Sequence, residues 1–348
     1  FELLIFSIIW DSRLFDIKSY ISKIYMFLNK IKDKYYYNLL NTFIEKGDVS
    51  EIKSLLKKIF ISNTNSDLNI LNNYIIKFLS EQKYEKLFNK NLVWVNSFED
   101  SSCKYINKFL VNILSLNDIS FVEPSKYVDE LYDFIKTRNI NKVDFEDMCN
   151  MNYVYQYFLS EKKEDIKILN SSASFFETAN NIYFTHYFLT RSYIYIIKNP
   201  YEIFQRNKLN NISDIKINHM QELIGGEIND IHHKYENDYY SVSENRQNWS
   251  TNVSSWTNPN VISTFRGFIL REEDLLSDPL QKLSEITSHL IQSGIDLKLD
   301  YSYLQNYISE NPIIIDHLDN FNFSKKELKI LDRDIGEVAD KFDYKPKS

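Results

Sequence analysis

The first quarter of the chain arranges its apolar residues in the three- and four-residue steps of amphipathic α-helices. One stripe comprises Ile17, Tyr20, Ile21, Ile24, Phe27, Leu28 and Ile31, and a second comprises Ile52, Leu55, Leu56 and Ile59. Between them, Gly47 predicts a helix end, and Asp48 with Glu51 has the spacing of a capping box at the next helix start. We therefore expect a small all-α region of helical hairpins over residues 1–90.

Part of this region weakly resembles a tetratricopeptide repeat. The phrase GDVSEIKSLL (residues 47–56) is similar to the turn and second helix of the repeat, and QKYEKL (residues 82–87) follows about one repeat length later. The small residues typical of the repeat are poorly matched, so a plain pair of helical hairpins is the preferred interpretation. Such helices are a candidate surface for a protein partner.

From Asn91 onward, short apolar runs alternate with helical stretches. Three runs predict buried strands: Leu92–Val95, Tyr193–Ile197 and Val261–Leu270. Between the first two strands, Asp129–Ile135 and Glu161–Leu169 are interpreted as helices. Strands that alternate with helices indicate a largely parallel sheet covered by helices on both faces. We therefore expect an α/β domain over residues 91–348.

Composition and charge narrow the possible functions. The 348 residues are 43% apolar and carry a formal net charge of −7. A general nucleic-acid binder is normally basic, so no nucleic-acid partner is expected, although a small anion needs only a local positive pocket. Cys103 and Cys149 have neither a disulfide framework nor metal-site spacing, which favours a reducing, cytoplasmic location. The apolar run Phe1–Trp10 is shorter than the roughly 20 residues that span a bilayer, so no membrane span is expected.

Two segments place polar side chains directly after predicted strands. Val95–Tyr105 (VNSFEDSSCKY) is a strand end followed by a hydroxyl-bearing turn and a helix start, where free N–H groups and the helix dipole favour an anion. Tyr193–Arg206 (YIYIIKNPYEIFQR) is a buried strand followed by a helix that begins at Pro200. A buried strand followed by a helix accounts for the local fold, but it does not account for the presence of Lys198 and Asn199 directly before Pro200.

Two further segments contain residues that suggest a specific chemical or structural role. Thr185-His186 lies in IYFTHYFL, and an imidazole near its own pKa is suited to accept a proton, although a lone histidine is more often structural. Farther along, Trp249, Val253 and Trp256 precede ILREEDLLSDP (residues 269–279), whose acidic residues have the spacing to cap the next helix.

In their order along the chain, these four segments resemble the PAPS-dependent sulfotransferases (PAPS is 3′-phosphoadenosine-5′-phosphosulfate). They are similar to that family's phosphosulfate loop, its Lys-Thr-His segment, its Val-Ile-Tyr-Val-Val-Arg-Asn-Pro strand and turn, and its Leu-Arg-Tyr-Glu-Asp-Leu segment. The resemblance covers roughly residues 91–344. It implies a P-loop-like, largely parallel sheet flanked by helices.

The resemblance also implies a reaction, in which the sulfuryl group of PAPS is transferred to a hydroxyl of a carbohydrate or a small alcohol. By position, Ser101, Ser102, Cys103 and Lys104 would hold the phosphosulfate, and Lys198 and Arg206 the 3′-phosphate. His186 would act as general base, and Lys104 would be a second catalytic residue through its charge. Positioning and charge neutralisation would supply most of the rate, and no metal is implied.

The phosphosulfate loop departs from the family pattern. Ser102 replaces a glycine and Cys103 replaces a threonine, while Glu99 and Asp100 place two carboxylates where the family has a basic residue. These carboxylates would repel a phosphosulfate. Lys198 keeps the charge of the family's arginine but loses its two-pronged hydrogen bonding.

Two alternatives to a sulfotransferase follow from these departures. The first is a catalytically degenerate protein of sulfotransferase fold that acts as a binding or interaction module through its N-terminal helices. The second is a P-loop nucleotide kinase, which requires G-x-x-x-x-G-K-[ST]. The loop lacks both glycines and the hydroxyl after Lys104, so the sulfotransferase remains the preferred hypothesis.

Overall fold

The computed structural model describes residues 32, 34–62, 65–98, 101–127, 130–131, 134, 145–161, 165–175, 184–210, 248–298, 300–313 and 323–346. The chain divides into two compact units, Phe1–Leu87 and Phe88–Ser348. The first predicted apolar stripe and the run Phe1–Trp10 lie outside the described residues, as does most of the predicted helix Asp129–Ile135.

The first unit is helical throughout its described part. Its elements are a helix over residues 34–46, α3 (Val49–Ser62), α4 (Asn65–Leu79) and the 3-10 helix η1 (Gln82–Leu87). Gly47 has a φ of 66°, a left-handed conformation that glycine adopts without strain, and it ends the first of these helices. Asp48 then caps α3, because its Oδ1 accepts a hydrogen bond of 3.1 Å from the Glu51 N–H.

The predicted stripe on α3 is confirmed, since Ile52, Leu55, Leu56 and Ile59 are all buried. The second repeat-like phrase, QKYEKL, forms η1 and not a pair of α-helices.

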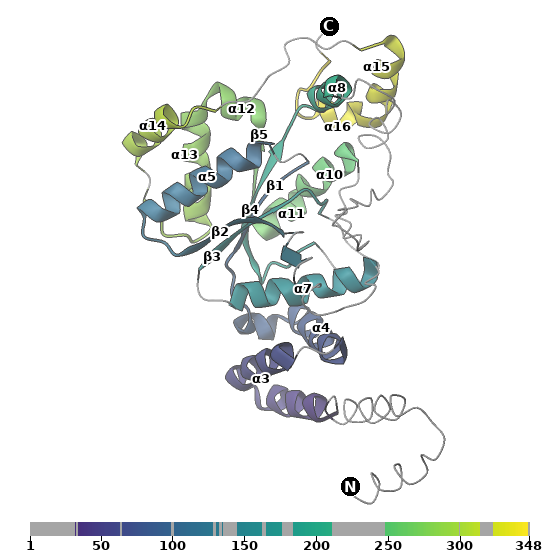
Figure 1. Cartoon of the computed structure of the whole chain (residues 1–348), viewed down its shortest axis with the longest axis vertical. Helices are drawn as coiled ribbons and strands as arrows, with labels where there is room; N and C mark the ends of the chain where they lie inside the picture. Colours follow the sequence, from purple (N-terminus) through teal and green to yellow (C-terminus); the bar gives the residue numbers. More distant parts are fainter. Residues whose placement is uncertain are drawn as a thin grey trace, which may run out of the picture. The chain divides into compact units, whose positions relative to one another are not determined.

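The second unit is built on an all-parallel sheet of five strands in the order β2-β3-β1-β4-β5 (Figure 1). The strands are β1 (Leu92–Ser97), β2 (Phe121–Lys126), β3 (Ile166–Ser171), β4 (Thr190–Ile197) and β5 (Gly267–Arg271). Together with the helices around the sheet and the helical first unit, this confirms the predicted α/β fold class. Among the described residues, no helix is both long enough and apolar enough to cross a membrane.

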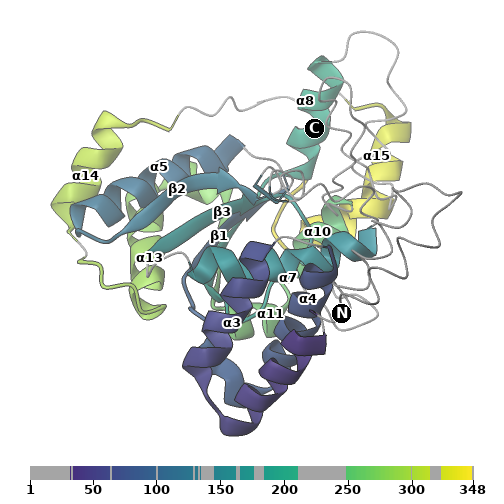
Figure 2. The ribbon, with the colours of Figure 1, turned by 60° about the horizontal axis from the view of Figure 1, so that its bottom comes forward.

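One face of the sheet packs against α5 (Ser101–Leu116), α13 (Pro279–Gln292) and α14 (Tyr301–Glu310), which gather on the same side in Figures 1 and 2. Successive residues of a strand point to opposite faces. Val93 and Val95 of β1 and Ile194 and Ile196 of β4 therefore share the aliphatic core on this face.

The opposite face is aromatic and is covered by α7 (Phe145–Glu161), α10 (Trp249–Trp256) and α11 (Pro259–Phe265). The ring of Trp256 lies 4.9 Å from that of Tyr193 and 5.8 Å from that of Tyr195, both on β4. Trp249, Val253 and Trp256 are fully buried, so the tryptophans of the fourth segment form part of this core.

Two predicted elements are wrong. The run Val261–Leu270 is not one strand, because Asn258 caps α11 through its side chain and Pro259 starts that helix, so that β5 begins only at Gly267. The stretch Glu161–Leu169 is not a helix, since α7 ends at Glu161 and β3 begins at Ile166.

The remaining helices surround the carboxyl ends of β4 and β5. α8 (Pro200–Asn210) follows β4 and begins at the predicted proline, and α12 (Glu272–Ser277) follows β5 directly. The chain ends with α15 (Lys325–Leu331), the π-helical turn η2 (Asp332–Gly336) and α16 (Glu337–Asp340). Tyr344, beyond α16, is buried and its hydroxyl lies 3.3 Å from the carbonyl oxygen of Ile197, which ties the chain end to β4.

Candidate functional site

The order of the strands identifies the edge of the sheet where a ligand is expected. β1 and β4 are neighbours, but the chain leaves β1 toward β2 on one side and leaves β4 toward β5 on the other. In open α/β sheets, ligands bind outside the carboxyl ends of the strands where the connections diverge in this way. Ser97 of β1 pairs with Ile196 of β4, so the residues that follow both strands meet at this point.

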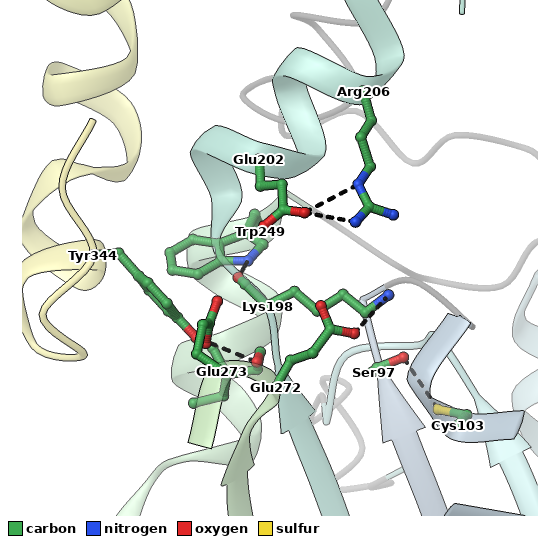
Figure 3. Close-up of polar contacts among 10 residues, drawn as sticks. Ser97, Cys103, Lys198, Glu202, Arg206, Trp249, Glu272, Glu273 and Tyr344 are labelled. Atoms are coloured by element: carbon green, nitrogen blue, oxygen red, sulfur yellow. Dashed lines mark hydrogen bonds and ion pairs between the residues drawn. The ribbon is translucent and has the colours of Figure 1, made fainter. Parts of the chain in front are cut away.

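Lys198 directly follows β4 and is buried at this edge. Its Nζ lies 3.5 Å from Oε1 of Glu272, the first residue of α12, and both side chains are about 5% exposed or less. Figure 3 shows the two side chains pointing toward each other. The indole N–H of Trp249 donates a hydrogen bond of 3.2 Å to the Lys198 carbonyl oxygen, which holds the backbone here.

Arg206 lies on α8, two turns after Lys198, and also faces a carboxylate. Its Nε and Nη2 donate hydrogen bonds of 3.2 and 2.6 Å to Oε1 of Glu202 (Figure 3). Lys198, Glu202, Arg206 and Glu272 line one pocket of about 10 Å³, roughly the space of a single water molecule, together with Asn199 and Ile203. The structure thus brings together the two residues predicted to hold the 3′-phosphate.

Internal carboxylates balance the charge of this pocket. Burial is the main influence on the Glu272 carboxyl and raises its pKa, while Lys198 acts in the opposite direction. Burial also raises the pKa of the neighbouring Glu273, whose Oε2 accepts a hydrogen bond of 2.8 Å from the Tyr344 hydroxyl. An anion that enters the pocket therefore has to compete with Glu272 for Lys198 and with Glu202 for Arg206.

The predicted phosphosulfate residues form the first turn of α5. Ser101 is its first residue, Lys104 is exposed, and the Ser102 hydroxyl is buried with no hydrogen-bond partner among the described residues. The first four N–H groups of a helix have no partner within the helix, so this turn offers donors to an anion. Glu99, Asp100 and the side chain of Ser101 lie outside the described residues.

Cys103 does not fit the predicted role of its side chain. The thiol is buried in the core, 3.2 Å from the Ser97 hydroxyl, and packs with the aliphatic face of the sheet (Figure 3). It faces the core because α5 begins at Ser101, which turns the third residue of the helix toward β1. Its backbone N–H still belongs to the first turn of α5, whereas the thiol faces the core.

His186 is not part of this site. It lies in the turn before β4, at the amino end of that strand, whereas Lys198 follows its carboxyl end. The eight residues of β4 span roughly 25 Å at about 3.3 Å per residue. The structure therefore does not bring His186, the predicted general base, together with Lys198. The strand that lies upstream and ends at the ligand edge is β3.

The surroundings of His186 fix both its position and its protonation. Thr185 is buried, and its hydroxyl lies 2.6 Å from Oε1 of Gln156 on α7 and 2.7 Å from the Thr190 hydroxyl. The Phe188 N–H donates a hydrogen bond of 3.2 Å to Nδ1 of His186, so the neutral ring carries its proton on Nε2. Burial, with a smaller contribution from Lys90, lowers the pKa of His186 to about 4.

This pKa predicts a loss of stability in mild acid. His186 binds a proton less readily in the folded protein than in the unfolded chain. Its contribution to the free energy of unfolding is therefore complete above about pH 6.5 and is lost as the pH falls toward 4. Between pH 7 and 4.5, the free energy of unfolding of His186→Gln should fall by about 2 kcal/mol less than that of the wild type, as measured by urea denaturation. Equal losses in the two proteins would contradict the assignment.

The sequence did not identify the acidic partners of the two cations. Glu202 could have been paired with Arg206 from their spacing of four residues on one helix. Glu272 required the register of the sheet, since β5 pairs with β4 up to Ile197 and Arg271 and thereby brings Glu272 beside Lys198.

Neither a metal site nor a similar known protein indicates the function of this edge of the sheet. The described residues contain no group of three or more His, Cys, Asp or Glu side chains that could hold a metal ion. No protein-family model matches the chain, and no curated protein sequence is significantly similar to it. What the site does must therefore be argued from its own residues.

Proposed function

We propose that the carboxyl edge of the sheet binds PAPS and that the protein transfers the sulfuryl group of PAPS to a hydroxyl of a carbohydrate or a small alcohol. The observation that carries this proposal is the shared pocket of Lys198 and Arg206 at the divergence of β1 and β4. Two cations 8 residues apart suit a phosphate monoester, because charge-assisted hydrogen bonds to phosphate are strong.

The first turn of α5 supports the other end of the nucleotide. The free N–H groups of this turn would face the 5′-phosphosulfate, and the buried Ser102 hydroxyl offers a donor that has no partner among the described residues. Lys104, exposed on the same turn, would neutralise charge that develops on the leaving phosphosulfate oxygen. His186 is not included, because it lies at the opposite edge.

Sulfuryl transfer is tested by measuring the release of 3′-phosphoadenosine-5′-phosphate (PAP) from PAPS in the presence of a panel of sugars and alcohols. Lys104→Gln should lower kcat by about 10- to 100-fold, because the lost cation acts mainly in the transition state. Lys108→Gln is the matched control, since Lys108 is also exposed and lies one turn farther along α5. Equal effects of the two substitutions would refute the role of Lys104.

The pairing of both cations with carboxylates favours a second candidate, a catalytically degenerate protein that retains the fold for binding. In that case the Lys198–Glu272 and Arg206–Glu202 contacts are structural, and the N-terminal helices provide the interaction surface. Tyr35 and Tyr37, which are exposed on the helix over residues 34–46, are consistent with such a surface. A well-folded protein that binds neither PAPS nor PAP would favour this candidate.

A further inference from the structure

A second and larger pocket lies on the aromatic side of the sheet, away from Lys198. Its volume is about 470 Å³, which is within the usual range for small-molecule sites. His186 and Tyr187, from the turn before β4, line it together with Phe175 after β3 and with residues of α10 and α11. None of these residues lines the pocket of the proposed PAPS site.

The described residues that line this pocket are neutral. Of the described residues that line the pocket, none is an acid, a lysine or an arginine, and the lowered pKa of His186 keeps its ring uncharged near pH 7. The nearby cation of Lys90 lies 5.8 Å from the centre of the Tyr187 ring and does not line the pocket. Among the residues that the structure describes around this pocket, a charged ligand would find no direct counter-ion, which is unfavourable.

Polar groups point to a ligand rich in hydroxyls. Nδ1 of His186 accepts a hydrogen bond of 3.2 Å from the Phe188 N–H, so Nε2–H is the second polar group of a ring that lines the pocket. The exposed side chains of Asn258, Asn260 and Thr264 add amide and hydroxyl groups along one side. Asn258 uses its Oδ1 to cap α11, which fixes that side chain at the rim.

Aromatic rings complete the lining. Phe265 and Phe175 are buried, with ring centres 4.8 Å apart. Tyr187, in the turn before β4, also lines the pocket. Aromatic faces pack well against apolar C–H surfaces, while the polar groups around them can pair with hydroxyls. A pyranose ring combines such C–H faces with neutral hydroxyl groups.

From these features we propose that this pocket binds an uncharged carbohydrate through His186, Asn260 and Thr264. The site is independent of the proposed PAPS site, because it lies at the other end of β4. It would hold a sugar as a recognition element and not present it to Lys198.

The test is saturation-transfer NMR on the full chain with methyl β-glucoside, methyl β-galactoside and N-acetylglucosamine, each at millimolar concentration, and with glucose 6-phosphate as the charged comparison. We expect transfer to the ring protons of at least one neutral sugar. Thr264→Trp, which fills the pocket, should abolish the signal. Ser263→Trp is the matched control, because Ser263 is the exposed neighbour on α11 that does not line the pocket, and it should retain the signal.

Three results would overturn this assignment: no transfer to any neutral sugar, equal transfer in Thr264→Trp and Ser263→Trp, or transfer to the phosphorylated sugar alone. Binding of PAP to Thr264→Trp is measured in parallel and should equal that of the wild type. The carbohydrate site and the PAPS site can therefore fail separately.

Discussion

Gly267→Ala should destabilise the protein by about 3 kcal/mol or more. A Cβ at Gly267 would lie 2.2 Å from Cζ and 2.3 Å from the hydroxyl oxygen of Tyr193. That ring cannot move aside easily, because it is fully buried, packs 4.9 Å from the Trp256 ring and donates a hydrogen bond of 2.6 Å to the Trp256 carbonyl oxygen.

Gly336→Ala is the matched control for this prediction. A Cβ at Gly336 would meet only Asp332 Cβ, at 3.8 Å, and the residue is helical, so alanine should stabilise the protein by up to about 1 kcal/mol. Urea denaturation of the two variants measures both effects. Similar midpoints for Gly267→Ala and the wild type would mean that β5 does not approach Tyr193 as described.

Lys198→Met should lower the free energy of unfolding by about 3–5 kcal/mol at neutral pH, because it leaves the carboxylate of Glu272 buried without its cation. The double variant Lys198→Met/Glu272→Leu should recover most of this loss, since removing both members of a buried pair is often nearly neutral. If the effects of the two substitutions add instead, Lys198 and Glu272 do not interact in the folded protein.

The pH dependence of Lys198→Met provides a further check. Burial raises the pKa of Glu272 in the folded state, and the loss of Lys198 removes the opposing influence. A carboxyl with a raised folded pKa destabilises the protein as the pH rises through that pKa. The deficit of Lys198→Met relative to the wild type should therefore shrink as the pH is lowered through the raised pKa of Glu272, where its carboxyl takes up a proton.

The parts of the fold that could be predicted from sequence are those whose burial is uniform. β1 and β4 are covered on both faces, and their continuous apolar runs identified them. β2 was missed because it is a partly exposed edge strand with Glu123 and Pro124 inside it. β3 was missed because the charged residues before Ile166 suggested a continuing helix.

The position of His186 could not be predicted, because β3 was missed and Thr185-His186 was assigned to neither end of a strand. The local pair Lys198 and Arg206 was found because nine residues of continuous sequence contain both. Glu272 was not, because a contact across 74 residues depends on the register of β5 against β4.

The most direct test of the PAPS site is calorimetric titration of PAP into the wild type, Arg206→Gln and Arg333→Gln. Arg206 is chosen because its side chain is 29% exposed, so its replacement disturbs the fold less than that of Lys198, and Arg333 is an exposed arginine outside the pocket. We predict that PAP binds the wild type and Arg333→Gln equally and binds Arg206→Gln at least about 10-fold more weakly. The absence of PAP binding to folded wild type, or equal binding to all three proteins, would contradict the account.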